Sequence, residues 1–250
     1  MSFRFKRFAV NDSHCAMKVG TDSVLLGAWV AVDGVRAALD AGAGSGLLAL
    51  MVAQRQPLAT VTAVELDSDA TADCRANFEA SPWADRLHGV CGDFAATVPD
   101  RPVDLLISNP PFFTETLQSP RAARATARHA AGSLSPLTLI DYAARHLSAG
   151  GTLAMIAPTA MDSDITFAAE LAHLAISRQT HVVTRPGTPP SRTLWQIART
   201  DGVGNEAAQP ASGTLTPYCH DTITLRNPDG TWTDAYLQLT ADFYLRPPGT

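Results

Sequence analysis

The most chemically specific residues in this sequence form the motif Asn109-Pro110-Pro111-Phe112, which follows the apolar run 103–108. Such a run predicts a buried strand, so we expect the motif at one edge of a sheet. Asn109 offers a side-chain oxygen as a hydrogen-bond acceptor, and Pro110 offers only a carbonyl because proline has no N–H. A base can stack on the Phe112 ring. The motif therefore predicts a pocket for a flat molecule that carries an amine.

These acceptors suit methyl transfer, because binding both N–H groups of an exocyclic amine favours a pyramidal, more nucleophilic nitrogen. A plainer interpretation stays open on these four residues alone. A strand end followed by a Pro-Pro turn, with Phe112 in the core, has the same sequence pattern. The segments upstream decide between the two interpretations.

A glycine-rich loop lies upstream of the motif. Residues 35–41 predict a short strand that carries Asp40, and Gly42, Gly44 and Gly46 then lead into a helix. The alternate glycines let the backbone pass close to a ligand, and the helix start offers unpaired N–H groups. In the dinucleotide fingerprint the third glycine lies one residue later, so a pyrophosphate cofactor is disfavoured. S-adenosyl-L-methionine has no phosphate, and we expect Asp40 to bind its methionyl ammonium directly or through water.

Acidic residues also end the next two predicted strands. Glu65 is placed to bind the two hydroxyls of a ribose, although a strand-end glutamate is often only a solvated charge. Asp93 follows the strand expected at 87–91 and can accept the adenine amine of the cofactor, with Phe94 against the ring. In open α/β sheets ligands bind beyond the carboxyl ends of the strands, so these residues and Asn109 are expected to converge.

Lys18 and Thr21 come just before a helix expected at 23–32. A lysine beside a helix N-terminus suits a carboxylate ligand, so we include both residues in the cofactor site. A structural role is equally compatible with the sequence, because Thr21 or Asp22 can cap that helix.

Basic residues form two groups that we expect to contact RNA. One group alternates with phenylalanines near the amino terminus, and the other follows the Asn-Pro-Pro-Phe motif. Their members are Arg4, Lys6 and Arg7 in the first group, and Arg121, Arg124 and Arg128 in the second. The plainer interpretations are an edge strand for the first group and a solvated surface loop for the second.

Length and composition set limits on the class of protein. A chain of 250 residues with 46% hydrophobic residues predicts one α/β domain over 1–250, with 1–30 as an N-terminal extension packed on or near the cofactor site. The net charge of −5 disfavours a protein that coats nucleic acid indiscriminately. Four cysteines without a CxxC pair indicate neither a disulfide framework nor a metal site. We see no signal peptide or membrane span and expect a cytoplasmic protein.

The remaining periodicity predicts further elements of an alternating α/β chain. Helices are expected at 68–80, 137–147 and 162–175, strands at 60–64, 152–157, 180–184, 193–199 and 221–226, and a loop at 201–217.

The ordered set of strand-end residues resembles the class I, seven-stranded S-adenosylmethionine-dependent methyltransferases. That resemblance implies a Rossmann-like, mostly parallel sheet with helices on both faces and an antiparallel C-terminal strand. More closely, the segments Phe-Lys-Arg-Phe, Cys-Ala-Met-Lys-Val-Gly-Thr-Asp, Leu-Leu-Gly-Ala-Trp, Gly-Ala-Gly-Ser-Gly-Leu-Leu-Ala-Leu-Met, Ala-Val-Glu-Leu, Ser-Pro-Trp-Ala and Asp-Phe-Tyr-Leu look like the bacterial tRNA1(Val) adenosine-N6 methyltransferases, from residue 3 to residue 245. The resemblance implies methylation of N6 of the adenosine at position 37, just 3′ of the anticodon.

Two departures from that family leave the substrate open. Phe112 stands where the family has tyrosine, and residues 201–217 look longer or differently composed. Asn-Pro-Pro-Phe also occurs in guanine-N2 methyltransferases of ribosomal RNA, usually with a histidine where this chain has Phe113. A protein-glutamine N5 methyltransferase and a non-catalytic module that binds S-adenosylmethionine are also compatible with these residues.

Overall fold

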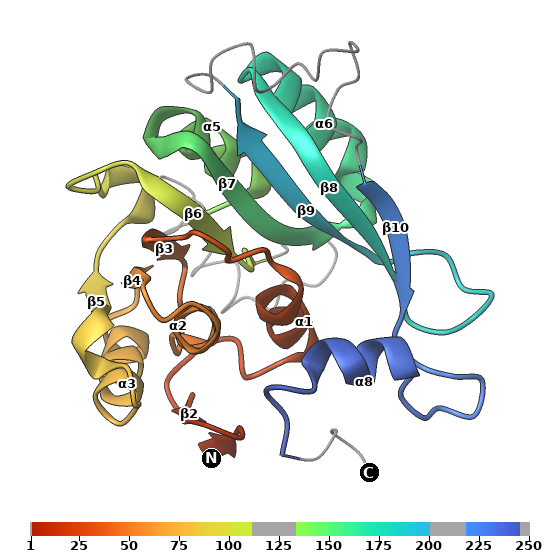
Figure 1. Cartoon of the computed structure of the whole chain (residues 1–250), viewed down its shortest axis with the longest axis horizontal. Helices are drawn as coiled ribbons and strands as arrows, with labels where there is room; N and C mark the ends of the chain where they lie inside the picture. The colour runs from red at the N-terminus through yellow and green to blue at the C-terminus, as the bar shows by residue number, and fades with distance from the viewer. Residues whose placement is uncertain (1, 112–133, 201–218, 246–250) are drawn as a thin grey trace, which may run out of the picture.

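The structure is a computed structural model that describes residues 2–111, 134–200 and 219–245 (Figure 1). Its centre is a twisted sheet in the order β10-β8-β9-β7-β6-β3-β4-β5. These strands are β3 (Ala37–Ala41), β4 (Thr60–Glu65), β5 (Leu87–Cys91), β6 (Val103–Ser108), β7 (Leu147–Pro158), β8 (Leu174–Val183), β9 (Arg192–Arg199) and β10 (Cys219–Thr224). A separate two-stranded sheet pairs β1 (Ser2–Arg4) with β2 (Ala9–Asn11).

Helices connect the strands and cover the sheet. The α-helices are α1 (Thr21–Trp29), α2 (Leu47–Arg55), α3 (Ser68–Glu79), α5 (Pro136–His146), α6 (Asp162–Leu171) and α8 (Asp234–Thr240). The 3-10 turns are η1 (Ala84–Arg86), η2 (Phe94–Ala96) and η3 (Thr159–Met161).

The sheet has the expected class I topology. Strands β5, β4, β3, β6 and β7 are parallel to one another, and β9 runs antiparallel between β7 and β8. The expected Rossmann-like fold is confirmed, and β9 is its antiparallel strand. The expectation of seven strands is exceeded, because β10 pairs in parallel with β8 and adds an eighth strand at that edge.

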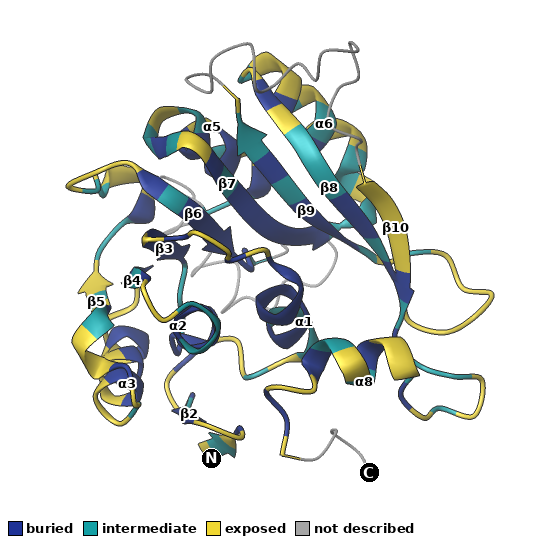
Figure 2. Cartoon of the chain, in the orientation of Figure 1, coloured by how far each residue is buried: buried dark blue, intermediate teal, exposed yellow. Residues whose placement is uncertain are grey.

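Both faces of the sheet are buried. Leu105 and Ile107 of β6 pack with α1, α2 and α3, whereas Leu106, between them, packs with α5 and α6. Successive side chains of a strand point to opposite faces, so a strand covered on both faces has an unbroken apolar sequence. Figure 2 shows β6 and β7 as largely buried, whereas β10 at the edge is mostly exposed.

Helix α1 is held against both α2 and the sheet. A Cβ built on Gly27 would lie 2.5 Å from Met51 Sδ, so the two helices approach closely there. Trp29 Nε1 donates to Thr180 Oγ1 at 2.9 Å. The N-cap of α1 is Gly20, without a side-chain cap, so the alternative interpretation in which Thr21 or Asp22 caps this helix is wrong.

The boundaries of α6 and β8 differ from the sequence-based expectation. Helix α6 ends at Leu171, four residues earlier than expected, and β8 begins at Leu174. His173 between them has φ of 55°, a left-handed conformation that stops a helix. Periodicity alone does not reveal this turn, because His173 is not a typical helix terminator.

We expect Gly46→Ala to lower the free energy of unfolding by about 2–5 kcal/mol. Gly46 precedes α2 with φ of 79°, and an added Cβ would lie 2.5 Å from Phe78 Cε1. Left-handed strain of about 1–2 kcal/mol adds to overpacking of about 1–3 kcal/mol. Gly187→Ala is the matched control, because Gly187 has the same φ of 79° with nothing within 4 Å. Equal losses for both variants in urea unfolding would contradict the close contact at Gly46.

Candidate active site

Two buried side-chain oxygens without partners lie at the carboxyl ends of neighbouring strands. Asp40 on β3 is paired across the ladder with Ile107 on β6, and Asn109 follows two residues later, about 7 Å farther along the chain. Asp40 Oδ1 and Asn109 Oδ1 have no hydrogen-bond partner among the described residues. An unpaired buried acceptor costs about 1–3 kcal/mol. This edge of the sheet therefore offers two acceptors to a ligand.

Asp40 is suited to a cation. Its Oδ2 accepts a hydrogen bond from the Ala49 N–H at 3.1 Å, and its side chain is almost completely buried. Burial raises the pKa of this carboxyl to about 7; the nearby Glu65 carboxylate adds to the increase, and the Ala49 bond opposes it. An ammonium group at Oδ1 would satisfy the unpaired oxygen and favour the charged form.

Glu65 holds the glycine loop. Its Oε2 accepts from the Gly44 N–H at 2.8 Å, and its Oε1 accepts from the Asp67 N–H at 2.9 Å. The Gly42 N–H donates to Val64 O at 2.9 Å, so the loop lies across the end of β4. A Cβ built on Gly44 meets nothing within 4 Å. Each carboxylate oxygen can accept a second hydrogen bond, so Glu65 can support the loop and bind hydroxyls together.

Asn109 is anchored through its amide nitrogen. Its Nδ2 donates to Ser23 Oγ of α1 at 2.8 Å, so the oxygen is the unpaired end of the carboxamide. Ser108 Oγ donates to Ala41 O at 2.7 Å and joins the ends of β6 and β3. Pro110 is buried and Pro111 is partly buried. Phe112 lies outside the described residues, so its stacking on a base stays a prediction.

Asp93 lies at the same edge, and Phe94 lies in the core. Asp93 Oδ1 accepts from the Ala95 N–H at 2.9 Å and caps η2. Gly92 N–H donates to Glu65 O at 2.9 Å, which brings the end of β5 next to Glu65. Phe94 is 5% exposed and packs on Tyr142, with ring centroids 4.4 Å apart. Its expected contact with adenine stays a prediction and would involve only the small exposed part of the ring.

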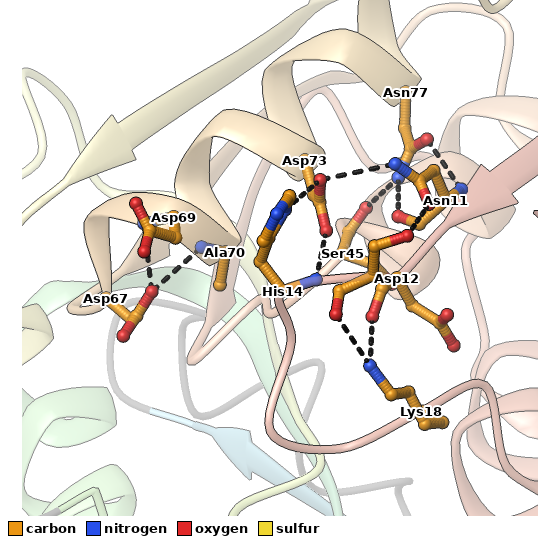
Figure 3. A network of polar contacts seen from close by, with 11 residues as sticks. Asn11, Asp12, His14, Lys18, Ser45, Asp67, Asp69, Ala70, Asp73 and Asn77 are labelled. Carbon is orange, nitrogen blue, oxygen red and sulfur yellow. Dashed lines mark hydrogen bonds and ion pairs between the residues drawn. The ribbon is translucent and has the colours of Figure 1, made fainter. Parts of the chain in front are cut away.

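A polar network attaches the N-terminal segment to α3 and the glycine loop (Figure 3). Asn77 Nδ2 donates to Asn11 O at 2.8 Å and to Ser45 O at 2.9 Å. His14 N–H donates to Asp73 Oδ2 at 2.8 Å, and its ring Nδ1 lies 2.9 Å from Asp73 Oδ1. The hydrogen bond with Asp73 raises the pKa of His14. Asn77 thus connects the N-terminal segment directly to the loop between β3 and α2.

The structure gives Lys18 a different set of contacts from those expected. Lys18 Nζ donates to Asp12 O at 2.5 Å and to Ser13 O at 3.1 Å, so the ammonium closes its own loop (Figure 3). The ammonium has three N–H groups and uses two of them here, so its expected contact with a carboxylate stays a prediction. Thr21 is the first residue of α1 and is partly buried.

The first basic group lies away from this edge. Lys6 Nζ donates to Ala241 O at 2.5 Å, and Arg7 lies over the Trp83 ring at 5.4 Å. Lys6 and Arg7 also line a cavity of about 570 Å³ beside Arg55, the last residue of α2. Helix α2 has nine residues and is therefore about 13 Å long. The cavity lies at its C-terminal end and the glycine loop at its N-terminal end.

The structure therefore does not bring Lys6 and Arg7 to the predicted methyl-transfer edge. Arg4, in β1, is exposed. The second basic group, Arg121, Arg124 and Arg128, lies outside the described residues, as does the expected loop at 201–217.

Two site residues had no clear signal in the sequence. A serine in the first turn of a helix is typical of capping, so Ser23 did not stand out. Asn77, near the end of α3, has the pattern of an ordinary polar helix residue. Within residues 2–111, 134–200 and 219–245, no group of three His, Cys, Asp or Glu is arranged to hold a metal, and no helix is long and apolar enough to span a membrane.

Solved structures with the same fold are methyltransferases. A predicted O-methyltransferase from Agrobacterium tumefaciens has a TM-score of 0.64 at 19% identity, covering 89% of this chain and 96% of that one. A 16S rRNA N2 G1207 methyltransferase from T. thermophilus, in complex with AdoMet and guanosine, has a TM-score of 0.53 at 19% identity, covering 80% of this chain and 50% of that one. At 19% sequence identity, this similarity shows only that the fold is shared.

Sequence comparisons give the family. A model of the methyltransferase small domain matches residues 11–182. The tRNA1(Val) (adenine(37)-N6)-methyltransferase of Aeromonas hydrophila is 41% identical over 98% of this chain and 97% of its own. The protein of the same name from Shewanella amazonensis is 40% identical over 98% of this chain and 100% of its own. The chain therefore belongs to the methyltransferase small domain family, which uses S-adenosylmethionine, and within it to the family of the tRNA1(Val) (adenine(37)-N6)-methyltransferases.

Proposed function

We propose that this chain methylates the N6 amine of an adenosine in tRNA, at position 37 of tRNA1(Val). The observation that carries the proposal is the Asn109 carboxamide, whose nitrogen is bound by Ser23 and whose buried oxygen has no partner in the part of the chain that the structure describes. Asn109 lies next to Asp40, as expected for a residue that accepts hydrogen bonds from a target amine beside the cofactor site. The relatives that match over nearly the whole chain are named for this reaction. A tRNA substrate also implies a cytoplasmic enzyme.

S-adenosylmethionine supplies a methyl group bonded to a positively charged sulfur. Asp40 Oδ1 accepts its ammonium, which neutralises an otherwise unpaired buried carboxylate. Glu65 accepts the ribose hydroxyls while it continues to hold Gly44, and Asp93 accepts the adenine amine of the cofactor. These three acidic side chains come from the ends of β3, β4 and β5, which lie side by side.

Asn109 Oδ1 and the Pro110 carbonyl accept the two N–H groups of the target amine. These bonds turn the nitrogen lone pair out of the ring, toward the methyl group. The N–C bond forms as the S–C bond breaks, the S–C electron pair stays on sulfur, and the methylated nitrogen then loses its proton to water. No dedicated base is needed before the attack.

The target base must leave its stack to reach Asn109, which costs less in an anticodon loop than in a duplex. Phe112 follows the prolines directly and would stack on the extruded base. We also propose that residues 1–30 form an N-terminal extension of a single methyltransferase domain. Arg121, Arg124 and Arg128 follow the motif along the chain, which supports RNA contact by this group more than by Lys6 and Arg7.

We expect wild-type protein to transfer labelled methyl from the cofactor to tRNA, and Asn109→Ala to lower kcat by at least about 100-fold. Loss of one preorganised hydrogen-bonding group that acts on the reacting atoms has this magnitude. Cofactor affinity should survive, because Asn109 holds only the target amine. Labelled methyl in ribosomal RNA instead of tRNA would favour guanine-N2 methylation, and labelled methyl in a release factor would favour glutamine-N5 methylation. No label in tRNA, ribosomal RNA or release factor would favour a non-catalytic module. Full activity of Asn109→Ala would overturn the assignment.

Cofactor affinity should fall as the pH drops below about 7. Burial raises the pKa of Asp40 to about 7, so at lower pH the carboxyl is neutral and cannot pair with an ammonium until it loses its proton. The expected slope is up to about tenfold in Kd per pH unit. Calorimetry from pH 5.5 to 7.5 measures how Kd for the cofactor changes with pH. The variant Asp40→Asn should remove this pH dependence.

The same pKa shift has the opposite effect on the free protein. An unfolded Asp loses its proton near pH 4, so stability without cofactor should fall as the pH rises from about 4 to about 7. If affinity and stability changed in the same direction over that range, Asp40 would not be the titrating group.

Glu65→Ala should weaken cofactor binding about 10- to 100-fold, since the protein loses two charged acceptors for hydroxyls and one support of the glycine loop. Asp67→Ala is a matched control two residues later. Asp67 caps α3 by accepting from the Asp69 and Ala70 N–H groups, so its loss should cost about 1 kcal/mol of stability and leave Kd nearly unchanged. An unchanged Kd in Glu65→Ala, measured by calorimetry, would remove Glu65 from the cofactor site.

A further inference from the structure

We propose that Ser23 is a positioning residue that holds the Asn109 carboxamide in place, with its oxygen toward the substrate, an inference that rests on the proposed methylation of an amine. Ser23 precedes Asn109 by 86 positions and belongs to α1, outside the strand-end residues that form the rest of the site. Its hydroxyl oxygen lies 2.8 Å from Asn109 Nδ2.

The orientation of this amide decides what Asn109 offers to a substrate. A carboxamide can rotate by 180°, which exchanges an acceptor oxygen for an N–H₂ group with two donors. An adenine or guanine amine also donates, so the rotated form would place donors against donors. In the observed orientation Ser23 accepts from the nitrogen, and the oxygen has no hydrogen-bond partner among the described residues. The Ser23 hydroxyl can also donate, so it would hold a rotated amide too, and the amine of the substrate is what disfavours the rotated form. Once an amine binds to that oxygen, both ends of the carboxamide are satisfied.

Helix α1 is fixed firmly enough to carry this contact. Asp22, next to Ser23, pairs with Arg192 of β9 at 3.2 Å. At the other end of α1, Trp29 bonds to Thr180 and lies 4.5 Å below the Arg178 guanidinium. A hydroxyl on a rigid element can hold another side chain in one rotamer.

The strand that carries Asn109 is fixed as well. Ser108 is buried and bonds to Ala41 O on β3, so the backbone just before Asn109 has little freedom. With both the backbone and the amide nitrogen held, the position of Asn109 Oδ1 is defined before any substrate binds. Ser23 thus supplies preorganisation, whose loss affects the chemical step more than binding.

The test compares Ser23→Ala and Ser23→Thr with wild type in steady-state methylation of tRNA. We expect Ser23→Ala to lower kcat about tenfold, the effect of one lost hydrogen bond, and to change KM for tRNA and Kd for S-adenosylmethionine by less than about twofold. Ser23→Thr keeps the hydroxyl and should restore kcat to within about twofold of wild type. Ser163→Ala, the same change in the exposed first turn of α6, is the matched control and should have no effect.

A spectroscopic measurement observes the contact without turnover. The side-chain NH₂ resonances of Asn109, identified by their absence in Asn109→Ala, should shift and exchange faster with water in Ser23→Ala. If Ser23→Ala does not fold, Ser23→Cys takes its place, because a thiol is only a weak acceptor and the same changes are expected.

The outcomes separate this inference from the proposed function. If the wild-type protein does not methylate tRNA, the proposed function is contradicted. The Asn109 resonances then test only whether Ser23 and Asn109 are in contact. An active wild type with normal kcat in Ser23→Ala, or with unshifted Asn109 resonances in that variant, overturns the positioning role. Failure of Ser23→Thr to recover activity would also overturn it, since a retained hydroxyl must keep the bond.

Discussion

Among the described residues, Asp40 and Asn109 each leave one buried side-chain oxygen without a hydrogen-bond partner, and these two oxygens are the constraint on which the candidate site depends. Leaving them unpaired costs stability, so the surrounding fold must hold them in place against rearrangement. The parallel pairing of β3 and β6 sets their spacing, and both side chains are buried, with 1% of Asp40 and 9% of Asn109 exposed. One oxygen belongs to a carboxylate and suits a cation, whereas the other belongs to a neutral amide and suits an amine. In the proposed site this difference in charge is the reason for placing the cofactor ammonium at β3 and the target amine at β6.

Much of this edge could be predicted from the sequence. Strands β5 and β6 have the predicted limits. The apolar run of β6 ends at the Asn-Pro-Pro motif, and β5 lies between Arg86 and Gly92. The positions of Asp40 and Glu65 followed from the rule that parallel strands meet ligands at their carboxyl ends. Local pattern and this one topological rule were therefore enough to place the strand-end acceptors.

The contacts made by other side chains could not be predicted in this way. Lys18 could equally reach a ligand or its own loop, and only the folded chain shows that it bonds to the carbonyls of Asp12 and Ser13. The alternation of phenylalanines and basic residues predicted that Lys6 and Arg7 lie on a strand-like segment. It did not show which end of α2 this segment would approach. The Ser23 contact joins residues far apart in sequence, and neither residue type implies the other. The direction in which a side chain points, and its contacts with residues far away in the sequence, depend on packing. A local sequence pattern does not contain that information.

Asn77 connects the N-terminal segment to the glycine loop, so this segment can influence the proposed cofactor site without touching the cofactor. One amide group bonds to Asn11 on one side and to Ser45 of the glycine loop on the other. Order in the two segments is therefore thermodynamically linked, and by reciprocity a cofactor that orders the loop also strengthens attachment of the segment. Trimming the chain at its amino terminus would consequently weaken a site whose acidic residues all remain.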